Sequence, residues 1–79
     1  MNLITKLKQM EGKTIERVAE IVAYDQVGIV FTDGNYTIID ATEYNDGNAC
    51  VTLEQDVDKY SLFKMGIISE DEYLLLTSN

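Results

Sequence analysis

Carboxylates are the main side chains in this sequence that could do chemistry. The 79 residues include 14 Asp and Glu, six Lys and Arg, no His and a single cysteine, Cys50. Without histidine and with one thiol, the chain can build neither a zinc site of the Cys and His type nor a histidine-activated nucleophile. Paired carboxylates can act as a general acid and base. Because these acids fall mainly at predicted turns and helix starts, and so short a chain leaves little room for a substrate cleft, we expect no enzyme and no cofactor.

One group of oxygen donors, between Glu43 and Glu54, resembles a calcium loop in composition. If Gly47 were the sixth residue of an EF-hand loop, Tyr44 would have to supply a ligand oxygen and Leu53 would have to be the bidentate glutamate. Neither side chain fits that role. The sequence therefore predicts a polar hairpin turn here, and no metal site.

The acids are distributed unevenly along the chain. Residues 1–17 carry a net charge of +2, whereas residues 18–58 contain nine acids and no cation. With a formal charge of -8, the chain is not expected to bind nucleic acid or an anionic membrane directly. A continuous acidic surface can attract a basic groove on another protein. The same charge also suits solubility alone, since small soluble domains commonly carry a net charge of magnitude about 2 to 8.

Helices are predicted at both ends of the chain. Apolar residues at helical spacing predict a short helix over 2–11, which Gly12 ends. Residues 56–65 are predicted to form a second helix. A third, over 70–76, follows Ser69, which begins a capping-box pattern with glutamate three residues later.

Strands are predicted in the middle of the chain, around two Asp-Gly pairs typical of hairpin turns, Asp33-Gly34 and Asp46-Gly47. Residues 14–24 fit a helix or a strand, and their β-branched side chains favour a strand. The four predicted strands form an antiparallel meander and cover residues 14–24, 27–32, 36–44 and 49–53. With two-residue loops at both turns, the predicted core face consists of Val27, Ile29, Phe31, Tyr36, Ile38, Val51 and Leu53.

These elements predict one small α+β domain over residues 1–79, with the helices packed on the sheet. The second sheet face, which holds Val30, Ile39 and Cys50, is apolar enough to predict a homodimer unless a helix covers it. No apolar segment approaches the ~20 residues of a membrane span, and a lone cysteine is not typical of an oxidising compartment. We therefore expect a cytoplasmic protein of a bacterium or a phage-infected cell.

In length, charge and predicted α+β architecture, the chain resembles small acidic phage inhibitors, a class that includes anti-CRISPR and DNA-mimic proteins. The resemblance implies a non-catalytic inhibitor that binds a basic surface on a nucleic-acid-binding or defence protein. The predicted partner-binding residues are two tyrosines beside turns and five acids of the hairpin region: Tyr24, Asp25, Asp33, Asp40, Glu43, Tyr44 and Asp46.

Two other functions fit the same sequence. One is a homo-oligomer that encloses a small-molecule ligand between subunits. A phosphate-rich ligand would be repelled there except near the four N-terminal cations, which are Lys6, Lys8, Lys13 and Arg17. The other is a small structural or regulatory protein of a phage or bacterium.

Overall fold

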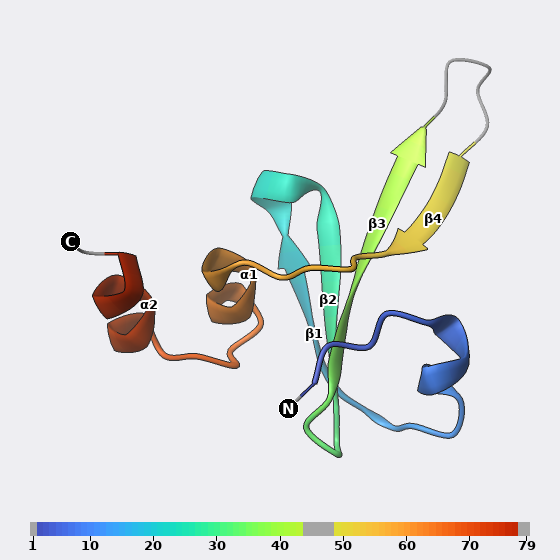
Figure 1. Ribbon diagram of the computed structural model, residues 1–79, viewed down its shortest axis with the longest axis horizontal. Helices are drawn as coiled ribbons and strands as arrows, with labels where there is room; N and C mark the ends of the chain where they lie inside the picture. Colours follow the sequence, from blue (N-terminus) through green and yellow to red (C-terminus); the bar gives the residue numbers. More distant parts are fainter. Residues whose placement is uncertain (1, 44–48, 78–79) are drawn as a thin grey trace.

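The computed structural model describes residues 2–43 and 49–77 (Figure 1). Its strands form one antiparallel sheet in the order β1-β2-β3-β4, and two α-helices follow the sheet. The α+β class and the meander are thus confirmed. The elements, with η marking 3-10 turns, are η1 (Leu7–Met10), β1 (Ile15–Ile21), η2 (Val22–Tyr24), β2 (Gln26–Phe31), β3 (Tyr36–Glu43), β4 (Ala49–Leu53), α1 (Lys59–Lys64) and α2 (Glu70–Thr77).

The N-terminal segment is not the predicted helix over 2–11. Only η1 is helical, as a single 3-10 turn, and Leu3 forms a parallel bridge with Tyr36. The backbone N–H of Ile4 donates to the Tyr36 carbonyl at 2.7 Å, and the hydroxyl of the fully buried Thr37 donates to the Ile4 carbonyl at 2.9 Å. A helix this short is marginal in water, so the segment gains more by pairing with β3 and burying Ile4.

The predicted register was wrong by one residue at both hairpins. Val30 lies opposite Tyr36, and Glu43 lies opposite Ala49. At the first turn Phe31 pairs with Asn35, so the loop has three residues and ends at Gly34, whose φ is +88°. That is the three-residue hairpin whose last loop residue is left-handed, a conformation that glycine adopts without strain.

This slip changes which side chains share the core face, because a shift of one residue reverses the face of a strand. Tyr36 and Ile38 are buried as predicted, but they share their face with Val30 and Gly28 rather than with Ile29 and Phe31. Val27, predicted in the core, is exposed, whereas Phe31 is buried outside the main cluster. The main cluster consists of Ile21, Val30, Tyr36, Ile38 and Met65.

Helix α1 packs on this core face. Met65, at the end of α1, is fully buried against Gly28, where an added Cβ would lie 2.6 Å from the Met65 Cγ. The Arg17 guanidinium of β1 donates to the carbonyls of Met65 and Gly66 at 2.9 and 3.2 Å. It thereby satisfies carbonyls that the end of α1 leaves without an intrahelical partner.

Helix α2 packs on α1 and not on the sheet, contrary to the prediction that both helices cover it. Figure 1 shows α1 between α2 and the strands. The Tyr73 ring stacks on Phe63 with centroids 4.9 Å apart, and it also meets Tyr60 edge to face. The predicted helix start is confirmed, since the Glu72 N–H donates to the Ser69 hydroxyl at 3.1 Å.

Candidate functional site

The structure separates the predicted partner-binding residues. Tyr24 and Asp25 lie at the β1–β2 turn, next to Asp40, which pairs with Gln26 across the sheet. Asp33 lies at the opposite end of these strands, in the β2–β3 turn. Glu43 is the last residue of β3, at the end of the strand away from Asp33, and nothing further is described of its side chain; Tyr44 and Asp46 lie outside the described residues.

Asp33 stabilises the turn in which it lies. Its carboxylate forms an ion pair with Lys13 and accepts the backbone N–H of Asn35 at 2.9 Å. The hydrogen bond from Lys13, followed by the one from Asn35, lowers the Asp33 pKa below its ordinary value. Because a cation already compensates its charge, Asp33 adds little to an acidic contact surface.

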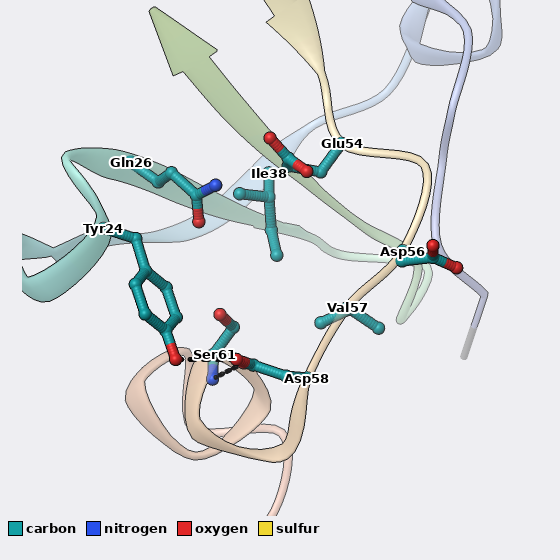
Figure 2. Close-up of a pocket in the computed structure, with 8 residues that line it drawn as sticks. All are labelled: Tyr24, Gln26, Ile38, Glu54, Asp56, Val57, Asp58 and Ser61. Atoms are coloured by element: carbon teal, nitrogen blue, oxygen red, sulfur yellow. Dashed lines mark hydrogen bonds between the residues drawn. The ribbon is translucent and has the colours of Figure 1, made fainter.

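A cavity of about 260 Å³ lies where the end of β1 and the entry to α1 meet the core face of the sheet (Figure 2). Segments distant in sequence build it, so only tertiary folding creates it. Its lining residues are Tyr24, Gln26, Ile38, Glu54, Asp56, Val57, Asp58 and Ser61. Of these, only Tyr24 was among the predicted contact residues.

Asp58 organises the wall of this cavity nearest α1. As the N-cap residue of α1, its Oδ1 accepts the Ser61 N–H at 2.8 Å. Its Oδ2 accepts the Tyr24 hydroxyl at 2.7 Å. The Tyr24 ring also meets Tyr60 edge to face at 5.5 Å, so both ends of its side chain are held.

The hydrogen bond between Tyr24 and Asp58 shifts the pKa values of both side chains. Partial burial acts to raise the Asp58 pKa, but hydrogen bonds from the Ser61 amide and the Tyr24 hydroxyl, with a smaller contribution from the nearby Ser61 hydroxyl, outweigh it and lower the pKa. The bond to Asp58 raises the Tyr24 pKa above 10.0. Asp58 is therefore ionised and Tyr24 neutral at pH 7.

Figure 2 shows how the remaining polar side chains lie. The Gln26 amide and the Ser61 hydroxyl point toward the middle of the cavity, and the Glu54 carboxylate lies at its edge beside Ile38. The Asp56 carboxylate points away from it. Glu54 is placed by its own backbone, whose N–H donates to the Ile38 carbonyl at 2.9 Å.

The carboxylate, amide and hydroxyl oxygens that line this cavity suit a cationic group. Among the described residues, no three acidic or cysteine side chains are placed to hold a metal ion. In the same part of the chain, no helix is long and apolar enough to cross a membrane.

No protein-family model, curated protein or solved structure matches the sequence. The chemistry of the cavity therefore rests on its own residues, which offer carboxylate, amide and hydroxyl oxygens.

Replacing Tyr24 by phenylalanine is expected to destabilise the fold in a pH-dependent way. A carboxylate with a lowered pKa contributes stability above its unfolded pKa, near 3.8, and this contribution is lost as pH falls through the folded value. Tyr24→Phe removes one of the hydrogen bonds that lower the Asp58 pKa. Its melting temperature should fall below that of the wild type at pH 7, and the gap should narrow near pH 2. A gap independent of pH would contradict the assigned bond.

Proposed function

We propose that the chain is a non-catalytic interaction protein that binds a basic surface on a partner protein. One observation carries the proposal: the fold gathers Asp40, Glu54, Asp56 and Asp58 around one end of the sheet, from a stretch without a single cation. Charges clustered in this way steer a partner of opposite sign and raise its association rate.

Two further features support this assignment. Tyr24 is 43% exposed beside the acids, and tyrosine is a common contact residue at protein interfaces. The resemblance in length, charge and fold class to acidic phage inhibitors extends the proposal to a role against a nucleic-acid-binding or defence protein, inside a bacterial or infected cell.

The test starts with the partner. The chain is immobilised and used to capture proteins from a bacterial lysate, and each captured protein is purified for rate measurements. We expect a basic protein whose association rate falls at least about tenfold between about 50 and 300 mM salt, because screening weakens steering. A captured partner that is acidic, or whose association rate ignores salt, would contradict the proposal.

A second candidate function is a homo-oligomer, and the other face of the sheet favours it. Val18, Val27 and Val51 lie on this face, on β1, β2 and β4, and they are 58%, 37% and 64% exposed. Ile29, Ile39 and Leu53 lie between them. Light scattering distinguishes the two functions, since the interaction protein needs no second copy and a ligand enclosed between subunits does.

A further inference from the structure

The cavity is open to solvent, so its volume indicates how much of a partner it can surround. Sites for drug-sized ligands usually measure about 300 to 1,000 Å³, whereas one water occupies about 30 Å³. At about 260 Å³, this cavity falls below the first range and far above the second. A single amino-acid side chain from another protein matches that size.

The polar groups that line the cavity all offer hydrogen-bond acceptors, and they carry a negative charge or none. Glu54 contributes a carboxylate and Gln26 an amide oxygen, and Asp58 adds a second negative charge at the wall. Ser61 is only 2% exposed, yet its hydroxyl points into the space. That hydroxyl lies near the Asp58 carboxylate and contributes to the lowering of its pKa. Even with its proton turned toward Asp58, its oxygen keeps lone pairs for a donor in the cavity.

Apolar side chains line the rest of the cavity. Ile38 is 1% exposed and forms the floor on β3, while the partly buried Val57 and the Tyr24 ring form the sides. This combination suits a long side chain that has methylene groups along its stem and a positive charge at its tip.

We propose that the cavity seats one arginine side chain of the partner protein, a statement that rests on the proposed function and deepens it. The guanidinium pairs with the Glu54 carboxylate and donates its remaining N–H groups to Ser61 and Gln26. Its stem lies on Ile38 and Val57. Arginine is favoured over lysine because it carries five donors in a planar fork and is more weakly hydrated, so entering a partly apolar cavity costs it less.

The test needs no natural partner. The ¹⁵N-labelled protein is titrated with N-acetyl-arginine-amide, and amide chemical shifts are followed. We expect saturable shifts clustered at Gln26, Glu54 and Ser61. Glu54→Gln should weaken binding about tenfold, because it removes a charged hydrogen-bond acceptor. The matched control Glu11→Gln makes the same chemical change at an exposed position that does not line the cavity, and it should weaken binding less than about twofold.

Three results would overturn the proposal. Equal weakening by Glu54→Gln and Glu11→Gln would mean that the probe senses net charge alone. Shifts spread over all acidic segments, or none at all, would mean that the cavity holds no arginine. Equal affinity for N-acetyl-lysine-amide would show that the cavity does not prefer arginine to lysine. The amide spectrum of each variant also reports whether it is folded. If the cavity binds no arginine, the proposed salt-dependent association with a basic partner can still hold. The two proposals can therefore be contradicted independently.

Discussion

Replacing Ile4 by alanine is expected to lower the free energy of unfolding by about 2 to 5 kcal/mol, the usual cost of truncating a buried isoleucine. Ile4 is 4% exposed, and its backbone joins β3 through bonds on both its N–H and its carbonyl. Truncation leaves a void between the N-terminal segment and the sheet. Denaturant unfolding of both proteins measures the difference.

Leu7→Ala is the matched control for this prediction. The helical spacing of the sequence puts Leu7 on the same apolar face as Ile4, but the structure leaves Leu7 68% exposed. Its truncation should change stability by no more than about 0.5 kcal/mol. Similar losses at the two positions would favour a packed helix over residues 2–11 and contradict the bridge to β3.

Adding a single methyl group at Gly28 is expected to cost about 1 to 3 kcal/mol, the range typical of an overpacked core. The Cβ of Gly28→Ala would lie 2.6 and 2.8 Å from the Met65 Cγ and Sδ, closer than real side chains approach. Met65 is 1% exposed and has little room to move. The contact between sheet and α1 must therefore loosen.

A double-mutant cycle makes this prediction specific. Met65→Ala alone should cost about 2 to 5 kcal/mol by emptying part of the core. In that background Gly28→Ala should cost less than about 1 kcal/mol, because the added methyl group enters space that Met65 has vacated. Additive losses in the double variant would show that Met65 does not pack on Gly28, and that the proposed core face is wrong.

The sequence was sufficient to predict the strands, their order and the capped start of α2, because these depend on local signals. The Asp33-Gly34 pair marks a turn, and Ser69 with Glu72 marks a helix start. The register was not predictable, since Asp-Gly suits loops of two or three residues. The N-terminal bridge was not predictable either, because the Ile4 N–H bonds to the carbonyl of Tyr36, 32 positions away, while the local spacing of Ile4 fits a helix.

The candidate site was harder to predict than the fold. Tyr24 could be chosen as a tyrosine beside a turn and Asp40 as an acid of the hairpin region, but the cavity depends on tertiary packing of three separate segments, residues 24–26, 38 and 54–61. Asp58 carried a local signal that was missed: a carboxylate immediately before a helical segment is a preferred N-cap. Nothing in the sequence distinguishes Glu54, whose carboxylate lies at the cavity edge beside Ile38, from Asp56, whose carboxylate points away.

The association rate of the captured partner with two charge variants tests the central claim most directly. Asp40→Lys with Asp56→Lys reverses two acids beside the cavity, whereas Glu11→Lys with Asp71→Lys makes the same change in net charge elsewhere on exposed positions. At low salt the first variant should associate at least about tenfold more slowly than the wild type, and the second within about threefold. Equal slowing of both folded variants would contradict a localised acidic binding surface.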